Sequence, residues 1–96
     1  MRRPERAHEA KGNLTPEQAF GVTVRRIRLM RGLSQQVLAD KSGYHRTYIG
    51  LLEHGQKSPS LRTVFNIATT LQVKPSDIVK RIERLVERTE GKTGKR

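Results

Sequence analysis

The chain has 96 residues, a formal net charge of +11 and no cysteine, which suits one small domain and excludes a disulfide framework or a thiolate metal site. Apolar residues make up 33% of the sequence, and no apolar run approaches the roughly 18 residues that a membrane-spanning helix needs. The excess of positive charge favours nucleic acid as the partner. We expect a cytoplasmic protein without a signal peptide, because no apolar segment follows the basic N-terminus.

The first helix is predicted to follow a short polar arm. Residues 1–14 are basic and show no periodic apolar pattern, so we interpret them as a disordered basic arm. Thr15 can cap a helix, Pro16 suits its first position and Gln18 completes a capping box. The apolar residues at helical spacing in this first helix are Phe20, Val24 and Ile27.

The next segment, residues 35–53, predicts two short helices on either side of one glycine. Ser34 is a good N-cap for the second helix, and Gly43 can end that helix in the left-handed conformation. A helix, a tight turn and another helix fit so short a segment as an αα-hairpin or a helix-turn-helix. Ala39 favours the helix-turn-helix, because helices that cross closely need a small residue at the contact. Ile49, on the third helix, can then fill the angle between them.

Two further helices complete the predicted domain, residues 15–79. Ser60 caps the fourth helix, in which Leu61, Val64, Phe65, Ala68 and Leu71 form an amphipathic stripe. The fifth helix, residues 75–89, overlaps the end of the domain and has an apolar seam with nearly heptad spacing. Such a seam is a liability on a monomer, so we predict a symmetric dimer. The dimer residues would be Ile78, Ile82, Leu85 and Val86, and residues 90–96 would form a loose basic tail.

The spacing of Ala39, Gly43, Ile49 and Leu52 resembles the helix-turn-helix of the lambda repressor and Cro class. The flanking motifs agree, with R-x-x-x-G-L-S-Q from Arg28, Y-I-x-x-L-E-x-G from Tyr48 and P-S-L from Pro59. The resemblance covers residues 20–79 and implies an all-α, five-helix, lambda-repressor-like DNA-binding domain. The tetrad Arg46-Thr47-Tyr48-Ile49 is also similar to the controller proteins of restriction–modification systems.

The resemblance places the recognition surface on the outward face of the third helix. Arg46 could read guanine through a bidentate bond, and Thr47 could bond a base edge or touch a thymine methyl. Gly50 and Leu51 depart from the polar readers usual in the family. The expected base-contacting residues are Arg46, Thr47, Gly50 and Leu51. The expected phosphate-contacting residues are Gln35, Tyr44, His45, Tyr48, Lys57 and Arg62, with Gln35 at a helix N-terminus that suits an anion.

Glu53 lies within the apolar stripe of the third helix, where a lone carboxylate is costly. The family pairs an arginine with a glutamate at the positions of Arg28 and Glu53. We therefore predict a partly buried, structural ion pair between these two residues.

We interpret the chain as a sequence-specific regulator that binds double-stranded DNA as a homodimer on a near-palindromic operator. The alternative is an antitoxin-type or scaffold module with secondary DNA binding. We expect no enzyme, cofactor or metal, because no nucleophile–base pair, phosphate loop or clustered histidines are found. No small-molecule effector is evident, since there is no room for a ligand domain. Membrane-surface binding by the fifth helix is disfavoured, because acidic residues interrupt its basic face.

Overall fold

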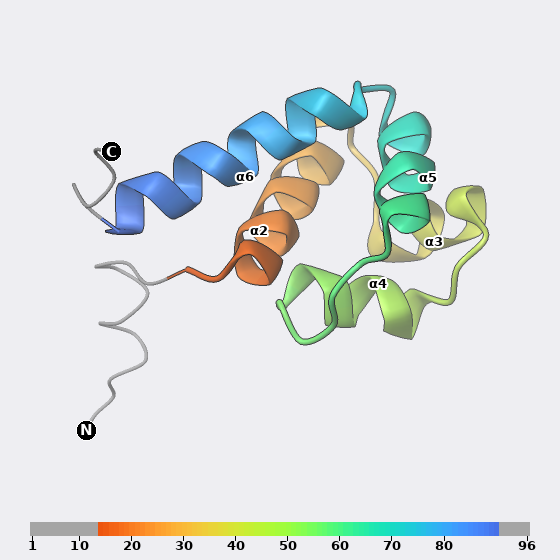
Figure 1. Cartoon of the computed structure of the whole chain (residues 1–96). Helices are drawn as coiled ribbons and strands as arrows, with labels where there is room; N and C mark the ends of the chain where they lie inside the picture. The colour runs from red at the N-terminus through yellow and green to blue at the C-terminus, as the bar shows by residue number, and fades with distance from the viewer. Residues whose placement is uncertain (1–13, 91–96) are drawn as a thin grey trace.

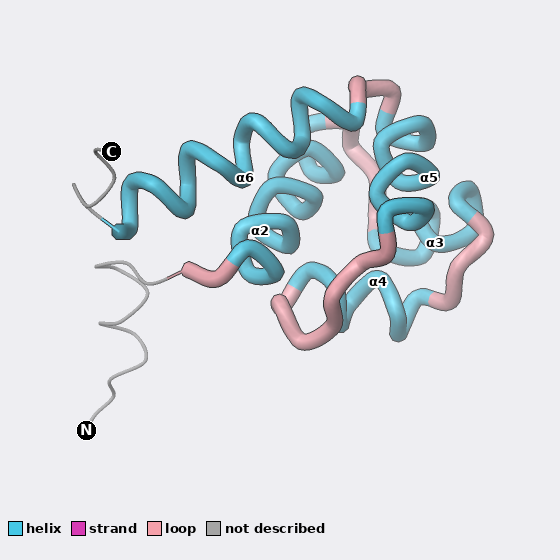
Figure 2. Tube along the Cα trace, viewed as in Figure 1, coloured by secondary structure: helices cyan, strands magenta, loops and turns pink. Residues whose placement is uncertain are grey.

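The computed structural model describes residues 14–90, with side chains up to residue 87. This part of the chain is all-α, as expected, with five helices (Figure 2). They are α2 (Pro16–Met30), α3 (Gln35–Ser42), α4 (Arg46–Glu53), α5 (Leu61–Leu71) and α6 (Pro75–Glu90). The predicted basic arm and basic tail lie outside the described residues, apart from Leu14 and Glu90. None of the described helices is long and apolar enough to cross a membrane.

The helix starts are fixed by hydrogen bonds between neighbours in the sequence. Thr15 Oγ1 accepts a 3.0 Å bond from the Gln18 N–H, and Gln18 Oε1 accepts a 2.9 Å bond from the Thr15 N–H. This is the predicted capping box. Ser34 and Ser60 accept bonds from backbone N–H groups in the same way at the starts of α3 and α5. His45 makes no side-chain cap bond at the start of α4.

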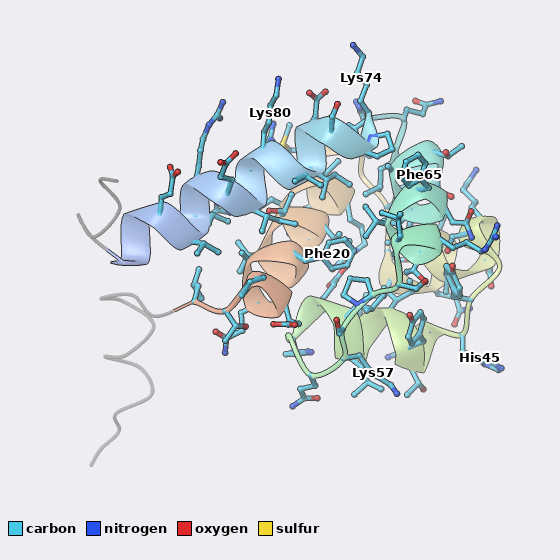
Figure 3. The ribbon with its side chains drawn as sticks, viewed as in Figure 1. Phe20, His45, Lys57, Phe65, Lys74 and Lys80 are labelled. Carbon is cyan, nitrogen blue, oxygen red and sulfur yellow. The ribbon has the colours of Figure 1, made fainter. Side chains whose placement is uncertain are left out.

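The helices pack around one core (Figure 1). α2 lies against α6 on one side and α4 on another, while α3 packs against α4 and α5. Phe20, on α2, points into the interior (Figure 3). The buried apolar core consists of Phe20, Val24, Ile27, Leu38, Ala39, Ile49, Leu52, Ile67, Ala68, Leu71 and Ile78. It draws on all five helices, so the helix-turn-helix is held by the rest of the domain.

The turn between α3 and α4 has the geometry of the predicted helix-turn-helix. Gly43 has φ +82° and donates its N–H to the Ala39 carbonyl at 2.9 Å. Ala39 and Ile49 are both completely buried. A small residue on α3 therefore lets the two helices cross closely, and Ile49 fills the space beneath the turn.

Gly21 marks a second close approach, between α2 and α4. A Cβ atom at this position would lie under 3.0 Å from the backbone carbonyl oxygens of Leu52 and Glu53. Backbone atoms cannot swing away as a flexible side chain can, so this crossing requires glycine. The sequence gives no local sign of this, because Gly21 lies within an otherwise ordinary helical pattern.

The apolar stripe predicted on α5 is divided between two faces. Leu61 is 74% exposed and Phe65 is 52% exposed, whereas Ala68 and Leu71 are buried. Thr63 and Ile67 face the core instead. α5 is apolar on both faces, and helical periodicity alone does not say which face the core takes.

One of the four predicted dimer residues belongs to the core. Ile78 is completely buried within its own chain, so it has no surface to offer a partner. Ile82, Leu85 and Val86 are half-buried along α6. Ile78 is therefore removed from the expected dimer surface.

Candidate DNA-binding site

The first turn of α4 presents two polar side chains to solvent. Arg46 and Thr47 are exposed, and Gly50 and Leu51, one turn later, are half-buried. Arg46 and Thr47 also line a shallow hollow between α3 and α4, with Gln36, Asp40, Gly43, Tyr44 and His45. The four predicted base-contacting residues therefore share the outward side of one short helix.

A buried ion pair fixes the far end of that helix. Arg28 Nε and Nη2 donate to the two carboxylate oxygens of Glu53 at 2.6 and 3.0 Å. The side chains are only 8% and 1% exposed, and Arg28 Nη1 also donates to the Leu33 carbonyl at 2.9 Å. The predicted pair is thus present, in the bidentate geometry that suits arginine. It fastens α4 to α2 and to the turn before α3.

Gln35 joins this ion pair. Its side-chain Nε2 donates to Glu53 Oε1 at 3.0 Å. An amide nitrogen carries two hydrogens, so one hydrogen remains for a phosphate oxygen. The pairing holds the Gln35 side chain at the N-terminus of α3.

A second network joins the turn, α4 and α5 through the buried hydroxyl of Thr63. Thr63 Oγ1 accepts bonds from the Tyr44 hydroxyl at 3.1 Å and from Ser60 Oγ at 3.0 Å. It lies 3.3 Å from the Tyr48 hydroxyl, and Asn66 Nδ2 donates to the Tyr44 hydroxyl at 3.0 Å. The two tyrosine rings pack at a tilt, with centroids 5.1 Å apart. Sequence reasoning missed Thr63, because a threonine at an inward helix position carries no distinctive signal.

The two tyrosines differ in what they can still donate. Either hydroxyl of the Tyr48–Thr63 pair can be the donor. When Thr63 donates, the Tyr48 hydroxyl hydrogen is available to another acceptor. Tyr44 instead uses its hydroxyl hydrogen on Thr63 and its N–H on the Ala39 carbonyl. Both Tyr44 donors are thus engaged within the free chain, and its phosphate contact stays a prediction.

The other expected phosphate contacts are exposed at the same end of the molecule or next to it. His45 and Lys57 project on the α4 side, while Lys74 and Lys80 lie on the opposite side (Figure 3). Arg62 is exposed in the first turn of α5. Within residues 14–90, the side chains of His45, Lys57 and Arg62 form no hydrogen bond or ion pair. Within the described residues, the donor groups of these three side chains are therefore available to a DNA phosphate.

Known proteins identify the family. The helix-turn-helix family model matches residues 24–78, more than half of the chain. The chain belongs to the lambda repressor-like helix-turn-helix family. Control protein C.BamHI of Bacillus amyloliquefaciens is 41% identical over 61 residues, covering 62% of this chain and 75% of that protein.

Solved structures agree with this assignment. The restriction–modification controller protein C.AhdI from Aeromonas hydrophila is 39% identical, with a TM-score of 0.62 over 64% of this chain and 92% of that one. C.Esp1396I, solved as a tetramer with its 35-base-pair operator, shares the fold with a TM-score of 0.69. Its identity is 23%, over 77% of this chain and 97% of that one. This helix-turn-helix protein is thus a DNA-binding transcriptional regulator.

Gly50 is not required by the packing of this helix-turn-helix domain. A Cβ atom there would meet nothing within 4 Å, in contrast to Gly21. The Gly50 carbonyl is 2.8 Å from His54 Nδ1, near the end of α4. The space outside Gly50 is therefore open, as a close approach to another molecule would need.

Proposed function

We propose that this chain is a controller-type transcriptional regulator that binds a near-palindromic operator as a homodimer, in the cytoplasm where the DNA lies. The observation that supports this proposal is the first turn of α4, where the side chains of Arg46 and Thr47 are exposed to solvent. The named relatives are controller or control proteins. We assign direct reading of bases to Arg46 and Thr47, with Gly50 and Leu51 facing the same groove.

The proposed phosphate contacts surround this turn. Lys57 and Arg62 supply charge, and His45 stands at the start of α4. Gln35 keeps one free amide hydrogen for a phosphate oxygen. Tyr44 and Tyr48 are held beside the same turn by their hydroxyl contacts with Thr63. Such contacts set the register of a protein on the duplex, and the base contacts supply the specificity.

Replacing Arg46 should separate reading from positioning. Arg46→Ala should weaken operator binding by about 1–3 kcal/mol per subunit while changing random-DNA binding less, because a bidentate arginine–guanine contact is lost. Lys57→Ala is the matched control. It should weaken binding to both DNAs equally and lower the slope of log affinity against log salt concentration by about one unit per subunit. The measurement is titration of each variant against operator and random duplexes over a salt series.

An equal loss on both DNAs for Arg46→Ala would make Arg46 a backbone contact and contradict the assigned reading surface. If the parent chain shows no preference among sequences selected from a random pool, the interaction-module alternative is favoured instead.

The proposed dimer uses α6 with a contribution from α5. Ile82, Leu85 and Val86 are half-buried, and Val79 is 51% exposed on the same helix. α5 adds the exposed Leu61 and Phe65, which lie one turn apart. Apolar side chains exposed in this way are typical of an interface. A two-fold pair would place its recognition helices about 34 Å apart, one turn of DNA.

Charge on this surface should break the dimer. Phe65→Asp and Val79→Asp should each shift the chain to the monomer, because a carboxylate would be buried in the interface. Both positions are exposed in the single chain, so the fold should survive. Met30→Asp is the control, since Met30 is exposed on α2 outside the proposed surface. Sedimentation at high micromolar concentration measures the result. A parent chain that sediments as a monomer would contradict the dimer.

A further inference from the structure

Three arginine side chains line a pocket between α2 and α6. It has a volume of about 160 Å³ and is lined by Thr23 and Arg26 of α2 and by Arg81, Arg84 and Leu85 of α6. No residue of α4 lines it. α6 lies along α2, and α4 packs against α2 elsewhere (Figure 1). The pocket is therefore separate from the candidate DNA-binding site.

The positive charges around this pocket are not balanced. No carboxylate lines it, and within the described residues none of Arg26, Arg81 and Arg84 forms an ion pair or a side-chain hydrogen bond. Asp77 lies in an adjoining hollow that also contains Arg81 and Arg84, yet it pairs with neither. Guanidinium groups keep their charge at all ordinary pH values, so three of them face one space without a counter-charge.

A buried hydroxyl group at this pocket also lacks a partner. Thr23 is 1% exposed, and its Oγ1 is the single buried side-chain polar atom without a hydrogen bond in the part of the chain described. Buried polar groups are nearly always hydrogen-bonded, so an exception calls for a missing partner. Since this oxygen is closed to solvent, it would donate to an oxyanion in the pocket only after the Thr23 side chain rotates toward it.

We infer that this pocket binds the phosphate group of an anionic ligand and thereby joins α2 to α6. The planar, forked donors of arginine match phosphate oxygens, Thr23 supplies one more donor, and Leu85 provides an apolar wall. The phosphate could belong to a free anion or a phosphorylated small molecule, or to a DNA backbone. This site is independent of the base-reading surface on α4 and goes beyond operator binding.

The first test uses inorganic phosphate as the probe. Phosphate should raise the melting temperature of the full chain above that in chloride at equal ionic strength, because it binds the folded state alone. Arg84→Gln should weaken phosphate binding on the order of tenfold, since a charge-assisted bond is lost. Thr23→Val should weaken it less and should not lower the melting temperature in chloride. Arg25→Gln, exposed on α2 and outside the pocket, is the matched control and should bind like the parent.

The second test separates the two sources of phosphate. A short random duplex is titrated with the parent and with Arg84→Gln across a salt series. If DNA supplies the phosphate, Arg84→Gln should lower the affinity and reduce the salt slope by about one unit. If a free anion supplies it, DNA affinity should stay near that of the Arg25→Gln control, and the phosphate response alone should change.

Three results would overturn the inference. One is the absence of a response to Arg84→Gln in both tests. Another is a phosphate response that Arg84→Gln and Arg25→Gln share equally. The third is tight binding of a glutamate-rich peptide that Arg84→Gln abolishes while phosphate has no effect, since this would assign the pocket to a protein partner. A failure of Arg46→Ala to alter base choice would leave these results unaffected, so the two proposals fail separately.

Discussion

Glu53→Gln should lower the free energy of unfolding by about 3–5 kcal/mol, because it leaves the Arg28 guanidinium buried without a counter-charge. The Glu53 carboxylate accepts three hydrogen bonds, two from Arg28 and one from Gln35. An amide offers only one acceptor oxygen and presents two hydrogens of its own. The loss would be a large fraction of the stability of an ordinary small domain. Urea denaturation, followed by helical circular dichroism, measures it.

Glu87→Gln is the matched control, since Glu87 is exposed on α6 and its replacement should cost less than about 0.5 kcal/mol. A double variant tests the cause. The double variant Arg28→Met, Glu53→Met should lose less free energy of unfolding than Arg28→Met and Glu53→Met lose together as single variants. The reason is that no unpaired charge stays buried in the double variant. If the free energy of unfolding of Glu53→Gln equals that of the parent within error, the ion pair does not stabilise the fold.

Gly21→Ala should destabilise the fold by about 3 kcal/mol, although alanine is the better helix former. The added methyl group would overlap the carbonyl oxygens of Leu52 and Glu53, so α2 and α4 must move apart, and such overpacking is costly. The same substitution at Gly50 should stabilise the fold by about 1 kcal/mol. The space around Gly50 is open, so only the higher helix propensity of alanine changes the free energy of unfolding. Urea denaturation of the two variants measures both effects.

This pair of variants also tests the role of Gly50. If the backbone at Gly50 approaches the bases closely, Gly50→Ala should bind operator more weakly than the parent despite its greater stability. Unchanged operator affinity would mean that the glycine has no part in recognition. A Gly21→Ala variant as stable as the parent would show that the crossing of α2 and α4 adjusts without cost.

Features determined by near neighbours could be predicted from the sequence. The capping box at Thr15 and the left-handed turn at Gly43 each involve residues within five positions of one another. The chemistry of those residue types is then sufficient to fix the local structure. The fifth helix was predicted over residues 75–89, and α6 ends one residue later, at Glu90. The pairing of Arg28 with Glu53 is long-range, and the family resemblance together with the cost of a buried carboxylate predicts it.

Features that depend on distant parts of the chain could not be predicted in this way. Gly21 requires glycine only because α4, more than 30 residues later, crosses it. The burial of Thr63 depends on two tyrosines and a serine whose hydroxyl groups meet only in the folded chain. For the same reason, the sequence does not show that the fold engages both Tyr44 donors. Helical spacing also does not distinguish a core position, such as that of Ile78, from a surface one.

The position of Thr63 on α5 has a consequence for the operator. This helix holds Tyr48 through Thr63 on one side and exposes Leu61 and Phe65 on another. In the proposed dimer, which uses α6 with a contribution from α5, the helix α5 would link each reading surface to the interface between the subunits. One extra base pair between half-sites would turn one of them by about 35° around the DNA axis, and the protein could follow only by breaking its hydroxyl network. We therefore expect the two half-sites bound by the proposed dimer to keep a fixed helical phase, even where the bases between them vary.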